Sequence, residues 1–257
     1  IDTAITMIKA STPPTSVSYD IFFKGNKAQW VRLANTIKMR ILMRQSYMPG
    51  RDTYIIPEIN KIVAEGSGLL QAGEDALSQP GFVAGTAGKI NPFYASYGWD
   101  QNGNQNNRFI RMTALLVNTM KSTGDTFRMK QVMYPKGGEN PDKPGTGLLV
   151  SNSANYIGVP FGTNNSTYVA EQTCPPGPHQ VIRGIQNLPM VVVTSAEAQF
   201  LMAEAKEKWP AVNLPKTAQE YYEQGVKESF RITGTSAAAA TTLLTNGNVL
   251  TDYTAAT

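Results

Sequence analysis

The first part of the chain repeats apolar and polar positions with the period of an α-helix. Between Ala28 and Tyr47, apolar residues recur at three- and four-residue spacing, which marks one face of a helix. That face comprises Trp30, Leu33, Ala34, Ile37 and Ile41. Met39 and Met43 fall on the opposite side. A helix with apolar residues on two sides is usually packed between neighbours, so the pattern predicts a helix that lies inside a core.

A second helix is predicted from Thr53 to Ala64. Its apolar stripe comprises Ile55, Ile59, Ile62 and Val63. Pro57 lacks an amide hydrogen, so we expect it in the first turn of this helix. The two helices then form a hairpin, and Asp75 to Leu77 add one more helical turn before the Pro80-Gly81 break.

Residues 81–189 lose this periodicity and are rich in Gly, Pro, Asn and Tyr. One helix is predicted within them, from Phe109 to Lys121. Its apolar positions are Phe109, Met112, Leu115, Leu116 and Met120. Gly124 follows where a left-handed C-terminal cap is expected. Long loops of this kind usually carry binding surfaces.

The helical pattern returns after a short extended run from Met190 to Val193. Two capping boxes are predicted, Thr194 with Glu197 and Thr217 with Glu220, in which hydroxyl and carboxylate each bond to the other residue's amide.

The helices that follow the two boxes interleave small and aromatic residues. The first carries Phe200, Leu201, Ala203 and Ala205 and stops before Pro210, and the second carries Tyr221, Tyr222, Val226 and Phe230 and ends near Gly234. This spacing is typical of a tetratricopeptide unit of ~34 residues. No structure is assigned after Ser236. The predicted fold is mainly α: tetratricopeptide-like hairpins at about 28–64 and 194–234, a loop-rich region between them, a low-complexity tail at 236–257, and no large sheet.

Composition excludes several classes of protein. The chain has 257 residues, of which 41% are hydrophobic and 16% charged, and its formal net charge is +4. Globular domains average about 25% charged residues, so we expect a globular protein with a neutral, amide-rich surface. The length allows one large core or two smaller ones. No Lys/Arg-rich run suggests nucleic-acid binding, and no segment approaches the ~20 apolar residues of a membrane-spanning helix.

The chain offers little for catalysis or metal binding. A single cysteine, Cys174, excludes an internal disulfide and a cysteine-based zinc site. A nucleophilic pair with His179 is the alternative for this thiol, although the two residues share a proline-rich loop. No pair of acids is evident, since Glu197 is assigned to a cap and Asp100 has no partner. We therefore expect neither catalysis nor a metal or other cofactor.

An aromatic cluster followed by amides is the strongest signal for ligand binding. Phe93, Tyr94, Tyr97 and Trp99 precede an Asn- and Gln-rich run that ends at Arg108. A flat ring on a sugar face, with amides bonding the hydroxyls, suits a neutral glycan. The predicted site comprises Trp99, Tyr97, Tyr94, Asn102, Asn104 and Arg108. The alternative is that the rings form a small core, and Tyr156 and Tyr168 are the next candidates.

Several segments resemble the SusD/RagB family of outer-membrane nutrient-binding lipoproteins. YDIFFKGN at 19–26 and WVRLANTIKMR at 30–40 are similar to the D-x-x-Y-x-G-D and W-x-K-F-A-N-S-L-x-x-R signature. Downstream, NPF at 91–93, GVPFG at 158–162, VTSAEAQFLMAEA at 193–205 and YYEQGVKESF at 221–230 resemble further family segments. DTFR at 125–128 replaces the family's D-P-R and is closer to a divergent SusD-like subgroup.

The resemblance implies a helical tetratricopeptide scaffold with a loop-rich ligand-binding part, displayed on a Bacteroidetes outer membrane. Such proteins cap a TonB-dependent, SusC-like transporter and pass oligosaccharides to it without catalysis. The anchoring lipid-bearing cysteine would precede Ile1, and a C-terminal part would follow Thr257. The alternative is a scaffold that contacts the transporter without binding sugar. Arg32, Arg40 and Arg44 form a candidate transporter edge, unless they are solvated or paired within the chain.

Overall fold

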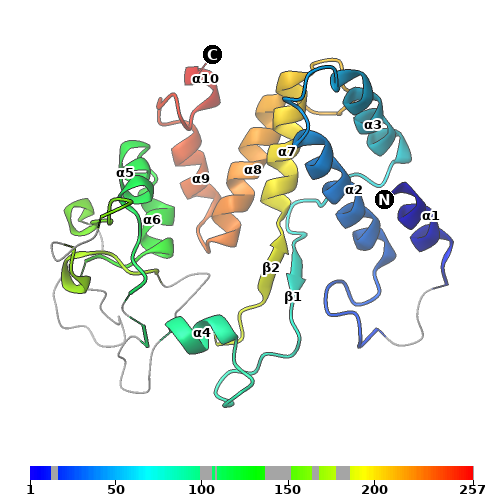
Figure 1. Cartoon of the computed structure of the whole chain (residues 1–257). Helices are drawn as coiled ribbons and strands as arrows, with labels where there is room; N and C mark the ends of the chain where they lie inside the picture. The colour runs from blue at the N-terminus through cyan, green and yellow to red at the C-terminus, as the bar shows by residue number, and fades with distance from the viewer. Residues whose placement is uncertain are drawn as a thin grey trace. The chain divides into compact units, whose positions relative to one another are not determined.

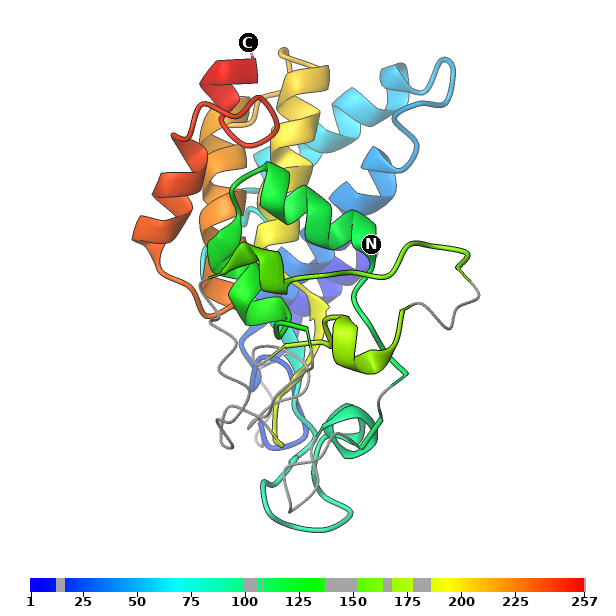
Figure 2. The same cartoon turned by 90° about the vertical axis from the view of Figure 1, so that its left-hand side faces the viewer.

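The computed structural model describes residues 1–12, 17–98, 106–107, 109–136, 152–163, 168–177 and 186–256. The described chain is helix-rich with a few short strands, which confirms the predicted class (Figures 1 and 2). It divides into two compact units, the first made of residues 1–80 and 190–229, the second of residues 81–189 and 230–257. No helix in the described ranges has both the length and the apolar composition to cross a bilayer.

The first unit contains the predicted helical hairpin. Its elements are α1 (Asp2–Ala10), α2 (Lys27–Met43), α3 (Asp52–Glu65), β1 (Ala76–Ser78), β2 (Met190–Val193), α7 (Ser195–Lys208) and most of α8 (Ala218–Ile232). α2 packs against α1, α3 and α7. Leu33 on one side of α2 and Met39 on the other are both buried, so the predicted sandwiched helix is confirmed. Ile41, expected on the apolar face, is exposed.

The boundaries of this hairpin differ from the predicted ones. α2 ends at Met43 instead of Tyr47, because residues 44–51 form successive tight turns. The Arg51 carbonyl accepts from the amides of Tyr54 and Ile55, so α3 starts earlier than expected. Pro57 therefore lies in the second turn of α3 and not in the first.

The segment predicted as a helical turn at Asp75 to Leu77 is extended instead. β1 pairs antiparallel with β2, with Ala76 opposite Val193 and Ser78 opposite Met190. The extended run predicted at Met190 to Val193 is confirmed as β2. Because the two strands lie more than a hundred residues apart in the sequence, a local pattern does not reveal their pairing.

The two predicted capping boxes are not equally formed. At the start of α8, the Thr217 amide donates to Glu220 Oε2 at 2.8 Å and the Glu220 amide donates to Thr217 Oγ1 at 3.2 Å, which confirms the box. At the start of α7, the Glu197 amide donates to Thr194 Oγ1 at 3.1 Å. The Glu197 carboxylate does not complete that box, because Arg40 Nε and Nη2 hold it at 2.5 and 2.6 Å.

α7 and α8 interlock through a glycine and an aromatic ring, as the tetratricopeptide-like pattern predicts. A Cβ on Gly225 would lie 2.7 Å from the Phe200 ring, so glycine permits the close approach. The Phe200 and Tyr222 rings also meet, with centroids 6.0 Å apart. The two helices lie side by side in both views (Figures 1 and 2).

The second unit has more helix than expected. It contains α4 (Pro92–Tyr97), α5 (Ala114–Ser122), α6 (Thr126–Val132), the 3-10 turns η1 (Ser153–Asn155) and η2 (Ala170–Gln172), α9 (Ala237–Leu244) and α10 (Tyr253–Ala256). Its core contains Val117, Met129, Met133, Tyr156 and Cys174. The helix predicted from Phe109 begins only at Ala114, because Thr113 caps it and the Met112 amide bonds to the Cys174 carbonyl at 2.8 Å. Gly124 follows α5 with φ 75°, which confirms the left-handed position.

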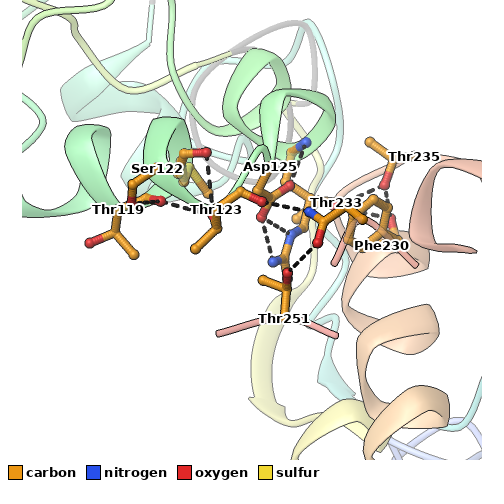
Figure 3. A network of polar contacts seen from close by, with 11 residues as sticks. Thr119, Ser122, Thr123, Asp125, Phe230, Thr233, Thr235 and Thr251 are labelled. Carbon is orange, nitrogen blue, oxygen red and sulfur yellow. Dashed lines mark hydrogen bonds and ion pairs between the residues drawn. The ribbon is translucent and has the colours of Figure 1, made fainter. Parts of the chain in front are cut away.

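The tail after Ser236, to which the sequence assigns no structure, contains α9 and α10. Ser236 Oγ accepts from the Ala239 amide and caps α9. Beyond α9, the side-chain amides of Asn246 and Asn248 each donate at 2.8 Å to carbonyls at the end of α5, those of Thr123 and Ser122. Figure 3 shows this end of α5 in its polar network. The low-complexity tail therefore supplies hydrogen-bond donors to the backbone carbonyls at the C-terminal end of α5.

Candidate ligand-binding site

The predicted ligand loop begins at α4, which a buried asparagine fixes in place. Asn91 is the N-cap, and its Oδ1 accepts from the Phe93 amide at 2.8 Å. Its Nδ2 donates to the Leu188 carbonyl at 2.6 Å, and its amide donates to the Gln186 carbonyl at 2.6 Å. These bonds join the two ends of the long middle region and anchor the start of α4.

Two of the α4 rings form a partly exposed pair. The Phe93 and Tyr97 ring centroids are 4.7 Å apart, one helical turn from each other, and Phe93 is 43% exposed. Tyr94 is only 8% exposed, which favours its interpretation as a core residue over its predicted role at a ligand. The Phe93–Tyr97 pair thus offers apolar ring surface to solvent at the start of the loop.

The loop closes at its base just after α4. The Asn106 amide donates to the Gly98 carbonyl at 2.9 Å, and Asn106 Nδ2 donates to the Ala95 carbonyl at 3.1 Å. A Cβ on Gly98 would lie 2.5 Å from the Tyr94 carbonyl oxygen, so this exit from the helix requires glycine. Four predicted site residues, Trp99, Asn102, Asn104 and Arg108, lie outside the described residues.

Burial separates the other rings of the second unit into core and exposed residues. Tyr156, an alternative stacking ring, is fully buried in the core, whereas Tyr168 is partly exposed. Phe109 and Phe161 are 93% and 77% exposed, and sequence reasoning did not select either as a site residue. Phe161 precedes Gly162, which adopts a left-handed φ of 74° in a turn.

The single cysteine is a core residue. Cys174 is fully buried, and its Sγ accepts from the Ile157 amide at 3.1 Å. Burial raises the pKa of its thiol to about 11, so the thiolate that a nucleophile requires is disfavoured. His179, the other member of the alternative catalytic pair, lies outside the described residues.

The carboxylate of Asp20 has a structural role. Asp20 accepts hydrogen bonds from the amides of Phe22, Phe23 and Gly25 and, at 2.8 Å, from Trp30 Nε1. Burial alone would raise the pKa of Asp20, but these bonds outweigh it and hold the pKa below its usual value. Across the described ranges, no three His, Cys, Asp or Glu side chains converge to hold a metal ion.

Residues of the 19–40 signature are therefore part of the scaffold. Besides the Asp20–Trp30 contact, Asn35 is buried, and its Nδ2 donates to Glu65 Oε2 at 2.8 Å and to the Gly68 carbonyl at 3.0 Å. These bonds tie α2 to the end of α3. The signature identifies a fold and does not by itself locate a ligand.

Two of the three arginines of the proposed transporter edge are paired within the chain. Arg32 Nε donates to Glu74 at 2.7 Å, and Arg40 forms the two-point contact with Glu197. For these two residues the structure supports the alternative of intramolecular pairing. Arg44 is exposed, and its guanidinium has no ion-pair partner among the described residues.

A protein-family model matches residues 1–257. Its description reads SusD-like, starch-binding, associating with the outer membrane. No curated protein is significantly similar to the chain.

Solved structures share the fold at low sequence identity. A SusD homologue from Bacteroides fragilis matches 95% of the chain and 51% of its own length, with a TM-score of 0.71 and 19% identity. One from Bacteroides vulgatus matches 95% of the chain and 44% of its own, with a TM-score of 0.68 and 22% identity. A chitin-binding SusD homologue from Flavobacterium johnsoniae matches 93% and 44%, with a TM-score of 0.64 and 25% identity. The chain spans about half or less of the length of these proteins.

Proposed function

The chain belongs to the SusD-like family, and from this premise we propose that it binds neutral glycans at the surface of an outer membrane without altering them. The match of the family model over all 257 residues is the observation that carries the proposal. Starch-like and chitin-like oligosaccharides are the two ligand classes to test first, because the family description names the former and a similar structure the latter.

We place the ligand at the loop that follows α4. The Phe93–Tyr97 ring pair is partly exposed there, and the Asn106 bonds to Gly98 and Ala95 fix the base of the loop. Trp99 is proposed as the stacking ring, with Asn102, Asn104 and Arg108 as partners of the sugar hydroxyls. Ring surface removed from water contributes on the order of 25 cal/mol per Å², and the polar groups set orientation.

Delivery of the bound sugar to a TonB-dependent, SusC-like transporter is the second part of the proposal, together with a lipid anchor on the cell surface. An outer-membrane location is consistent with the family description. The alternative is a scaffold that binds the transporter and leaves glycan capture to other proteins.

Titration calorimetry of the full-length protein with starch- and chitin-derived oligosaccharides tests the glycan proposal. We expect saturable binding to at least one of the two classes, with the sugar recovered at its original length. Absence of binding to both, alongside retention of the transporter in a pull-down, would favour the scaffold alternative. Shortened sugar would instead indicate a hydrolase.

A further inference from the structure

A buried serine joins two carboxyl groups where β2 leads into α7. Ser195 is the first residue of α7, and it is fully buried. Its Oγ lies 3.0 Å from Asp75 Oδ1 and 2.8 Å from Glu228 Oε2, so both contacts are hydrogen bonds. Asp75 directly precedes β1, and Glu228 belongs to α8. The three residues therefore connect three segments of the first unit that are distant in sequence.

The serine hydroxyl supplies only one hydrogen to these two acceptors. An ionised carboxylate can only accept hydrogen bonds, whereas a protonated carboxyl group can also donate one. With both acids ionised, two anionic oxygens would compete for the single hydrogen on Ser195 Oγ. One helical turn further along α7, Gln199 Oε1 is buried without a hydrogen-bond donor among the described residues. The Ser195 bridge therefore needs one more hydrogen, which a proton on either acid supplies.

The surroundings of the two acids assign this proton to Glu228. Asp75 Oδ1 also accepts from the Ser195 amide at 2.8 Å, at the N-terminus of α7, where the helix dipole stabilises an anion. Glu228 is 5% exposed, and burial disfavours the charged form of a carboxyl group. The Gly73 amide and Gln224 Nε2 donate to the two Glu228 oxygens at 2.8 and 3.2 Å, which fixes the side chain. Glu228 Oε2 then donates to Ser195 Oγ, which donates to Asp75 Oδ1.

The charged side chains of the surrounding segments leave one alternative. Those beside the bridge in the loop before β1 and in the first turn of α7 form two ion pairs with α2, which are Glu74–Arg32 and Glu197–Arg40. On α8, Lys227 and Arg231 flank Glu228, and Arg231 follows it by three residues, a spacing that permits an ion pair along a helix. An ionised Glu228 paired with Arg231 is therefore the competing state.

We propose that Asp75, Ser195 and Glu228 form a proton clamp, in which one proton on Glu228 completes the bridge between β1, α7 and α8. The folded protein holds this proton at a pH where a glutamate of the unfolded chain has already released it, so stability falls as the pH rises through the titration of the clamp. Deprotonation leaves two anions around one hydroxyl and weakens the bridge. Because β1 and β2 connect the first unit to residues 81–189, the clamp makes that connection sensitive to pH.

Urea unfolding of the full-length protein at about pH 6 and about pH 9 tests the clamp. We expect the urea midpoint of wild type to fall between the lower and the higher pH. Glu228→Gln supplies an amide hydrogen to Ser195 Oγ at either pH, so it should match wild type at the lower pH and lose most of the decline. Glu223→Gln, on the same helix, is the matched control and should decline as wild type does.

Infrared spectroscopy of the same protein detects the proton directly, because a protonated carboxyl group and a carboxylate absorb at different frequencies. We expect a carboxylic acid band near neutral pH that wild type loses at about pH 9 and that Glu228→Gln lacks. Because the band is measured in folded wild type, its absence there would overturn the proposal even if the variant did not fold. Destabilisation of Glu228→Gln at the lower pH, with the full decline retained, would also overturn it and would indicate an ion pair with Arg231.

Discussion

At the residue scale, the exposed fraction of each ring distinguishes rings that a ligand can reach from rings that pack in a core. Tyr94 and Tyr156 belong to cores, whereas Phe93 and Tyr97 keep ring surface in solvent. In the sequence, a ring that stacks on a ligand cannot be distinguished from a core ring, because the same turn residues flank both. The residues that surround the ring in space are needed to separate the two.

We predict that Trp99→Ala lowers glycan affinity without an appreciable change in melting temperature, because the ring is proposed to contact sugar and not the core. Titration calorimetry and thermal unfolding of the same preparation measure both quantities. Phe161→Ala is a matched control, since it removes a 77% exposed ring from the same unit. Unfolding of Trp99→Ala, or equal affinity losses in both variants, would remove Trp99 from the site.

A second residue-scale prediction concerns Glu65 and acid. Burial would raise the pKa of Glu65, but hydrogen bonds from Lys9, Asn35 and Ser67 lower it to about 2. Its folded-state pKa is therefore below its unfolded value of 4.5, so its stabilising contribution is complete above that pH and is lost as the pH falls toward 2.

Glu65→Gln should accordingly reduce the free energy of unfolding at pH 7 and flatten its decline between about pH 4.5 and 2. Urea unfolding at a series of pH values measures this. Glu204→Gln, at an exposed residue of α7, serves as the control. A decline as steep in Glu65→Gln as in wild type would show that other carboxylates govern the acid response.

At the element scale, local sequence patterns predicted where a helix begins better than which distant residues its side chains contact. Thr217 caps α8 as predicted, because all four atoms of that box belong to one short segment. The Glu197 carboxylate does not complete its capping box because it accepts two charged hydrogen bonds from Arg40, which is distant in sequence. The pairing of β1 was not predicted for the same reason, because residues 81–189 separate β1 from its partner strand β2 in the sequence.

Loss of a helix cap provides the element-scale prediction. Thr217→Ala should lower the free energy of unfolding by about 1 kcal/mol, the usual effect of losing an N-cap hydroxyl. Thr194→Ala should cost a similar amount, because its hydroxyl accepts the Glu197 amide even though the box is incomplete. Urea denaturation measures both variants, and Thr217→Ser, which keeps the hydroxyl, should unfold near wild type. No change in either alanine variant would mean that solvent replaces the cap.

At the scale of the whole molecule, the chain forms two compact units. The helical scaffold of the first unit was predictable from periodicity and capping. In the second unit the tail was not predictable, because runs of Ala and Thr carry no amphipathic pattern. Its role depends on asparagine contacts with α5, which lies over a hundred residues earlier.

The tail contacts predict a local stability effect. Asn246→Ala removes the bond to the Thr123 carbonyl at the end of α5 and should cost about 1–3 kcal/mol, as for an acceptor left unsatisfied. Asn248→Ala tests the more exposed bond to Ser122 and should cost less. Faster hydrogen exchange in α5 and α6, with unchanged exchange in α2 and α3, is the expected readout. Unchanged exchange in α5 would show that the tail contacts do not stabilise the C-terminal end of this helix.

The central claim is that the loop-rich part of the second unit binds a glycan. Hydrogen–deuterium exchange of the full-length protein, with and without a saturating oligosaccharide identified by titration, tests it most directly. The predicted result is protection of backbone amides at residues 91–109, with exchange at residues 44–54, between α2 and α3, unchanged. Protection confined to the helices of the first unit, or no change at residues 91–109 while the sugar is bound, would contradict the claim.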